Sequence, residues 1–69
     1  MTFDIYGKFR LEVLREQGGW NAYRVEPGKR VRVRDLLIPA SLATGDLATY
    51  LDDNFHELAQ PGQVVELIS

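Results

Sequence analysis

The stretch VLREQGGWNAYRVEPGKRVRV (residues 13–33) sets the architecture of this chain. Two turn signals within it, QGG (17–19) and EPGK (26–29), separate three runs in which apolar and polar residues alternate. Alternation with a period of two is typical of strands that bury one face, and glycine accepts the positive φ of tight turns. The stretch therefore predicts three antiparallel strands joined by two hairpins.

The register of these strands depends on loop length, because a slip of one residue turns every side chain to the other face. A three-residue loop at 17–19 sets Val13 opposite Tyr23, which keeps apolar residues on one face. A connection of odd length through 27–29 likewise aligns Tyr23 with Val33. The core face is then expected to carry Tyr23, Val25, Val31 and Val33, and the outer face Arg10, Leu14, Trp20, Ala22, Arg24, Arg30, Arg32 and Arg34.

The same alternation extends over residues 3–13, where large apolar side chains occupy odd positions from Phe3 to Val13. Gly7 falls on the apolar side of this run. A glycine inside a strand pattern marks a bulge, a bend or a close backbone approach, so this segment is either one bent strand or two strands.

The pattern lapses over LLIPASLA (36–43), where Pro39 excludes a regular central strand. Thr44 is a candidate N-cap for a helix over about residues 45–60, which QPG (60–62) ends. VVELI (64–68) then predicts a last short strand. The apolar face of the helix is expected to carry Leu47, Tyr50, Leu51, Phe55 and Leu58.

The element order predicted from these signals is β-β-β-α-β. One helix covering one face of an antiparallel sheet of three to four strands is the usual α+β solution. A chain of 69 residues has room for a single domain, spanning residues 1–69. It contains no cysteine, so its stability depends on apolar packing.

The charges separate along the chain. All eight Lys and Arg lie between Lys8 and Arg34, against four acids up to that point, whereas the rest of the chain holds six acids and no Lys or Arg. On the expected outer face Lys8 and five arginines meet Glu12, Glu16 and Glu26, which leaves an excess of about three positive charges beside Trp20. The net charge is nevertheless −2, with a pI near 5.2.

Three interpretations of this outer face remain open. A mixed aromatic and cationic face around Trp20, Arg24 and Arg32 suits a non-catalytic protein-interaction module, which binds an unknown partner or forms a weak homodimer. The same face could hold single-stranded nucleic acid by phosphate neutralisation and base stacking, although a dedicated binder is usually basic. Alternatively these are solvated strand positions, paired as Glu12/Arg24 and Glu26/Arg30.

The sequence shows no catalytic, cofactor or metal constellation. His56, the sole histidine, follows Asp52 and Asp53 by one helical turn, but a metal site needs at least a third ligand. No serine lies in a GxSxG elbow, and a glycine pair at 18 and 19 is too short for a phosphate cradle. We therefore expect a protein that is not an enzyme. No apolar run approaches a membrane span, and the expected compartment is the cytoplasm.

Two stretches carry a family resemblance. GGWNAYRVEPG (18–28), followed by one helix and a last strand, resembles the small HicB-type antitoxin domain, which implies a ββαβ-like sheet with a partner-binding or oligomerising role. FDIYGKF (3–9) and YLDDNFHELA (50–59) resemble a small bacterial family known as a domain of unknown function. The second resemblance spans most of the chain and implies no activity.

Overall fold

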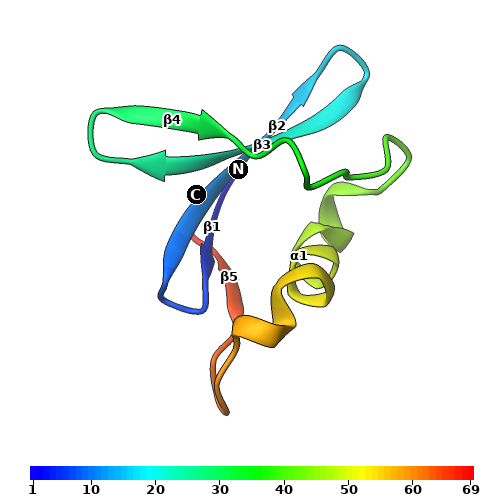
Figure 1. Cartoon of the computed structure of the whole chain (residues 1–69). Helices are drawn as coiled ribbons and strands as arrows, with labels where there is room; N and C mark the ends of the chain where they lie inside the picture. Colours follow the sequence, from blue (N-terminus) through cyan, green and yellow to red (C-terminus); the bar gives the residue numbers. More distant parts are fainter.

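The computed structural model describes residues 1–69 and contains five strands and one α-helix (Figure 1). The α+β class is confirmed, but the order is β-β-β-β-α-β, so the predicted strand count and order are wrong. The sheet is antiparallel with strand order β4-β3-β2-β1-β5. The elements are β1 (Thr2–Ile5), β2 (Phe9–Glu16), β3 (Gly19–Glu26), β4 (Lys29–Arg32), α1 (Leu47–Phe55) and β5 (Val65–Leu67).

The first alternating run divides at Gly7 into β1 and β2. Tyr6 and Gly7 both have positive φ, 56° and 72°, and the N–H of Lys8 donates to the carbonyl of Ile5 at 2.9 Å. This three-residue turn sets Ile5 opposite Phe9. Because the turn has an odd length, the odd-numbered side chains of both strands share one face.

The β2–β3 turn contains two residues, not the predicted three. Gln17 and Gly18 have φ of 53° and 76°, the pair of positive values that a type I′ hairpin requires. Val13 therefore lies opposite Ala22, and not opposite Tyr23 as predicted. This shift of one residue places Trp20, Ala22 and Arg24 on the face that α1 covers, and turns Tyr23 and Val25 outward.

The β3–β4 turn also contains two residues, Pro27 and Gly28, so the predicted odd-length connection is wrong. The φ of Gly28 is 74°, the positive value that a type II turn requires at its second central residue. Arg24 lies opposite Val31, and this second one-residue shift cancels the first. As predicted, β4 therefore directs Val31 toward the α1 side and Arg30 and Arg32 outward, but Val31 is 42% exposed and lies outside the core.

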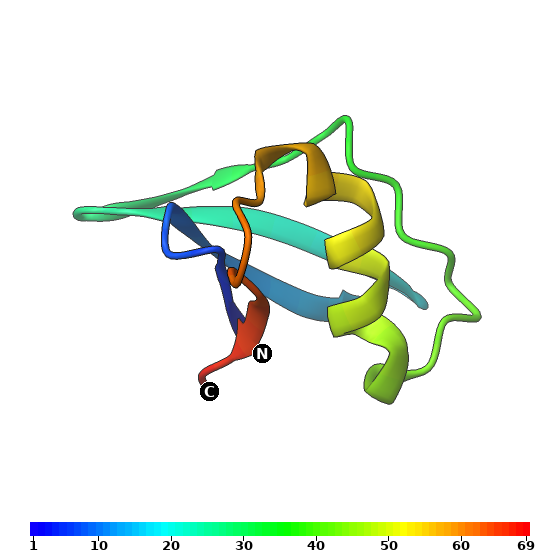
Figure 2. The same cartoon turned by 90° about the horizontal axis from the view of Figure 1, so that it is seen from below.

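Helix α1 lies against one face of the sheet (Figures 1 and 2), and the β3–β4 turn projects away from it (Figure 1). Short 3₁₀ turns at Thr44–Asp46 and His56–Leu58 flank α1, so helical structure covers 44–58. Thr44 is the first helical residue and makes no side-chain cap, which corrects its assignment as N-cap. The residues of the core, nine in all, are Phe3, Ile5, Tyr6, Leu11, Val13, Ala22, Ile38, Leu47 and Leu51.

The helix is short. None of the helical segments has both the length and the apolar character that a bilayer crossing would require.

A buried tyrosine ties α1 to the sheet. Tyr6 is 3% exposed, and its hydroxyl donates to the carboxylate of Asp52 and to the Asp52 backbone carbonyl, the latter at 3.2 Å. Burial, reinforced by this hydrogen bond and by the charge of Asp52, raises the pKa of Tyr6 to about 12.

The Tyr6 contact predicts a loss of stability in alkali. Because the pKa is raised above the usual 10.0, the stabilisation is complete below that pH and disappears as the pH rises toward about 12. Tyr6→Phe should destabilise the protein by about 1.5–3 kcal/mol at neutral pH, and its unfolding free energy should fall less between these two pH values. Urea unfolding across this range measures both effects. An alkaline loss of the same size in Tyr6→Phe and in the unaltered protein contradicts this assignment.

The observed register makes a second prediction, from two identical substitutions in β3. Ala22→Asp places a carboxylate at a position that is 2% exposed, which costs several kcal/mol and should unfold so small a domain. Val25 is 41% exposed, so Val25→Asp should cost about 1 kcal/mol or less. Circular dichroism and urea melts measure whether each variant folds and how stable it is. The register with a three-residue loop requires the opposite order of stability.

Candidate interaction surface

The face of the sheet opposite α1, here called the outer sheet face, has no element covering it. Even-numbered residues of β1, β2, β4 and β5 and odd-numbered residues of β3 point to this side. Its side chains are those of Thr2, Asp4, Arg10, Glu12, Leu14, Glu16, Asn21, Tyr23, Val25, Arg30, Arg32 and Glu66.

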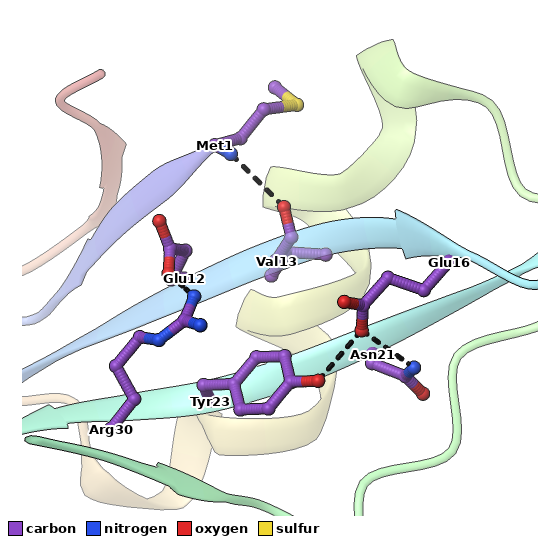
Figure 3. Close-up of polar contacts among 7 residues, drawn as sticks. All are labelled: Met1, Glu12, Val13, Glu16, Asn21, Tyr23 and Arg30. Atoms are coloured by element: carbon purple, nitrogen blue, oxygen red, sulfur yellow. Dashed lines mark hydrogen bonds and ion pairs between the residues drawn. The ribbon is translucent and has the colours of Figure 1, made fainter.

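Glu16 is the centre of a hydrogen-bond network on the outer sheet face (Figure 3). One oxygen of its carboxylate, Oε1, accepts from the side-chain amide of Asn21 at 2.9 Å and from the hydroxyl of Tyr23 at 2.7 Å. Arg32 Nη2 donates to Asn21 Oδ1 at 2.7 Å, which extends the network to β4. The three strands β2, β3 and β4 are thereby joined through their side chains.

The hydrogen bonds shift the pKa values of the two acidic groups in opposite directions. The pKa of Glu16 lies below its usual value, mainly because Asn21 and then Tyr23 donate to its carboxylate. The pKa of Tyr23 lies above its usual value, mainly because its hydroxyl donates to Glu16. Both shifts favour the protonation states of neutral pH, an ionised Glu16 and an uncharged Tyr23.

Arg30 continues the network in a second direction. Its guanidinium forms an ion pair with Glu12 and lies 4.9 Å from the centre of the Tyr23 ring (Figure 3). The Glu12 contact raises the pKa of Arg30 above its usual value. The side chain of Arg30 is 51% exposed, so the pair adds little to stability. Its main consequence is to hold the Arg30 guanidinium over the Tyr23 ring.

The outer sheet face is close to electrically neutral. Its three arginines meet four carboxylates, those of Asp4, Glu12, Glu16 and Glu66. The predicted excess of about three positive charges is therefore wrong. It counted Lys8, Arg24, Arg34 and Glu26, which lie off this face, and it omitted Asp4 and Glu66. The predicted pairs Glu12/Arg24 and Glu26/Arg30 are also replaced, since Glu12 binds Arg30 and Glu26 lies 3.9 Å from both Arg24 and Lys29.

The residues predicted as an interaction surface are divided between two faces. Arg10, Leu14, Arg30 and Arg32 lie on the outer sheet face, and Arg34 lies in the turn after β4. Trp20 and Arg24 lie on the side of α1, which corrects their predicted orientation.

Trp20 and Arg24 have structural partners on the α1 side. The indole Nε1 of Trp20 donates to the carbonyl of Leu42 at 3.0 Å, and the guanidinium of Arg15 stacks 4.7 Å from the Trp20 ring. The guanidinium of Arg24 lies 4.6 Å from the ring of Phe9, which in turn packs edge to face on Phe55. These contacts pack around the core on the α1 side, and Phe55 at the end of α1 takes part in one of them.

Tyr23 and Val25 are the members of the outer sheet face that the predicted register placed in the core. The type I′ turn is what directs Tyr23 and Val25 outward. Gln17 is not among the residues that favour the first central position of this turn, so the sequence does not indicate it. A prediction with a two-residue loop at Gln17 and Gly18 would have put Tyr23 and Val25 on the outer sheet face.

Other parts of the surface include a hollow beside Trp20 and an exposed histidine. A hollow of about 440 Å³ beside Trp20 is lined by Arg15 and by residues 40–44, and Arg15 already donates to the carbonyl of Ala40 at 2.7 Å. Within residues 1–69, no group of three or more His, Cys, Asp or Glu side chains converges in a way that could hold a metal ion. His56 is exposed, and its Nδ1 lies 3.0 Å from the carbonyl of Asp53.

The family model described as "Domain of unknown function (DUF7661)" matches residues 1–69, so this chain belongs to that family. The resemblance of residues 3–9 and 50–59 to a domain of unknown function is thereby confirmed, whereas the match does not bear on the likeness to HicB-type antitoxin domains. No curated protein and no solved structure matches the chain. The description of the family names no activity.

The Glu16 network predicts a specific titration. Asn21→Ala should raise the pKa of Glu16 toward the usual value of about 4.3, because it removes the hydrogen bond that lowers this pKa most. A titration of the Glu16 carboxyl carbon by NMR measures this shift. Asn54→Ala is the matched control, since the Asn54 amide donates to the Tyr50 carbonyl on α1, far from Glu16 in the fold. Equal Glu16 midpoints in the Asn21 and Asn54 variants contradict the network.

Proposed function

We propose that this chain is a non-catalytic interaction module that binds another protein through the outer sheet face. The observation that carries the proposal is an open five-stranded face on which Leu14, Tyr23 and Val25 lie among charged side chains of both signs. Leu14 and Tyr23 are partly buried there, and Val25 is exposed. An uncovered sheet face that presents aromatic and aliphatic side chains among polar ones is suited to a protein interface.

The hydrogen-bond network supports the proposal by fixing the contact residues in advance. Tyr23 is bound to Glu16, and Arg30 is bound to Glu12 and stacked on Tyr23. Tyrosine and arginine are among the residues that contribute most to binding at interfaces. Side chains that are already ordered lose less conformational entropy when a partner binds. The face therefore combines suitable residue types with low reorganisation cost.

Binding of single-stranded nucleic acid by the same face is the second candidate. Tyr23 between Arg30 and Arg32 supports it, since an aromatic ring beside cations can stack a base and contact a phosphate. It ranks second because Arg30 and Arg32 are already bound to Glu12 and Asn21, and four carboxylates share the face. A salt titration with single-stranded RNA separates the two candidates, because phosphate contacts give a steep loss of affinity with salt.

The proposed compartment is the cytoplasm. A small domain without cysteine is in keeping with it, since small secreted domains commonly depend on disulfides.

Arg32→Glu tests the protein-binding proposal. Reversing this charge in the outer sheet face should lower the amount of any specifically captured protein by about thirtyfold, the effect of a loss of about 2 kcal/mol at an interface. Lys8→Glu, in the turn between β1 and β2, makes the same change of charge away from the face and should leave capture unchanged.

Quantitative mass spectrometry of proteins captured by tagged variants gives the comparison, and circular dichroism shows that both variants are folded. Capture profiles that are identical for Arg32→Glu and Lys8→Glu contradict the proposal.

A further inference from the structure

Strand β5 forms one edge of the sheet, and the backbone groups of two of its three residues have no partner in the chain. The carbonyl of Val64 accepts from Tyr6 at 3.2 Å, and the N–H of Ile68 donates to Thr2 at 2.8 Å, so the even-numbered residues face β1. In an antiparallel ladder the alternate residues direct their N–H and C=O groups the other way. The backbone groups of Val65 and Leu67 therefore point out of the sheet and are free to pair with another strand.

The side chains along this edge are apolar and exposed. Val64, Leu67 and Ile68 are 61%, 51% and 40% exposed. The segment VVELI (64–68) reads apolar, apolar, acidic, apolar, apolar, so its pattern is symmetric about Glu66. A second copy of the strand, run antiparallel and centred on Glu66, sets Val65 opposite Leu67 and Val64 opposite Ile68. Every apolar side chain then meets an apolar partner.

The directions of the backbone N–H and C=O groups agree with this pairing. Val65 and Leu67, whose N–H and C=O groups point outward, become hydrogen-bonded partners, and Glu66 meets its own copy at the intervening position. On the α1 side, a hollow of about 200 Å³ between α1 and β5 is lined in part by Ala48, Thr49 and Val65. Leu67 of the second copy falls beside Val65, next to this hollow.

The opposite edge of the sheet lacks these properties. Strand β4 pairs through Val33, whose N–H donates to Ala22 at 2.9 Å, so its outward backbone groups belong to Arg30 and Arg32. Two copies of β4 would bring these arginines together, and charge on an edge strand is a known protection against pairing. Of the two edges, apolar β5 is therefore the one suited to pairing with a second copy.

We propose that two copies of this chain pair through β5 about a two-fold axis at Glu66, to form one continuous ten-stranded antiparallel sheet. A two-fold dimer is the commonest symmetric assembly, and a strand whose pattern is symmetric about one residue suits it. The inference goes beyond the proposed function, because it concerns the sheet edge and not the outer sheet face. In the dimer the two outer sheet faces become one surface of double the extent.

Val65→Pro tests the strand pairing. Proline removes an outward N–H and no hydrogen bond within the chain, and edge strands tolerate it. Sedimentation velocity over a range of concentrations should show a monomer–dimer equilibrium for the unaltered protein and monomer alone for Val65→Pro. Arg32→Glu, on the β4 edge, is the control and should dimerise like the unaltered protein. Circular dichroism shows that each variant is folded.

The two Glu66 carboxylates provide a test that does not depend on proline. Like charges directly opposite weaken a strand pair, so Glu66→Gln should tighten the dimer by about two- to fivefold. Glu66→Lys alone should dimerise as weakly as the unaltered protein or more weakly. An equimolar mixture of Glu66→Lys with the unaltered protein should form the mixed dimer in preference, because each lysine then meets a glutamate. Native mass spectrometry of one isotopically labelled partner measures the mixed species.

An unaltered protein that stays monomeric at the highest concentration reached overturns the inference. So does a dimer that survives Val65→Pro, or a mixture with Glu66→Lys that contains no excess of the mixed dimer. None of these results bears on the outer sheet face, whose test measures capture of other proteins. Conversely, identical capture by Arg32→Glu and Lys8→Glu leaves the β5 dimer standing.

Discussion

The two-residue turn at Gln17 and Gly18 is the constraint on which the rest of this structure depends. Both residues hold positive φ, and the turn they form pairs Val13 with Ala22. One more residue in that loop would bury Tyr23 and expose Ala22, because each step along a strand changes the face. The small Ala22 lies in the core, and Tyr23 is free to join Glu16 on the outer sheet face. A local backbone conformation thus determines both the packing and the surface chemistry of the protein.

The core that results is small, and specific contacts at its margins compensate. Nine residues are buried, and a single short helix covers one side of five strands. Tyr6 anchors α1 through Asp52, while Arg15 and Arg24 stack on Trp20 and Phe9 where the helix ends. These aromatic and cationic pairs occupy the α1 side, so they contribute to stability. They are not available for binding on the outer sheet face. What remains on the outer sheet face is nearly balanced in charge, which favours a protein partner over a phosphate backbone.

The proposals concern two surfaces of one sheet. The outer sheet face is preorganised by the Glu16 network, and the β5 edge offers free backbone groups beside exposed Val64, Leu67 and Ile68. The β4 edge carries arginines instead, so the two ends of the sheet differ in what they can bind. Pairing at β5 would extend the first surface without covering it, since strands added to an edge leave the faces of a sheet open.

The sequence by itself determined the α+β class, the odd-numbered core positions of β1 and β2 and the position of the helix, since these follow from periodicity. It also identified the outward arginines of β4, but only because two register errors cancelled. The membership of the outer sheet face, with Tyr23 in it and Trp20 and Arg24 outside it, was decided by the tertiary structure. The physical reason is that strand pairing depends on a turn conformation, and glutamine at position 17 gives no sign of the positive φ that it adopts once β2 and β3 pair.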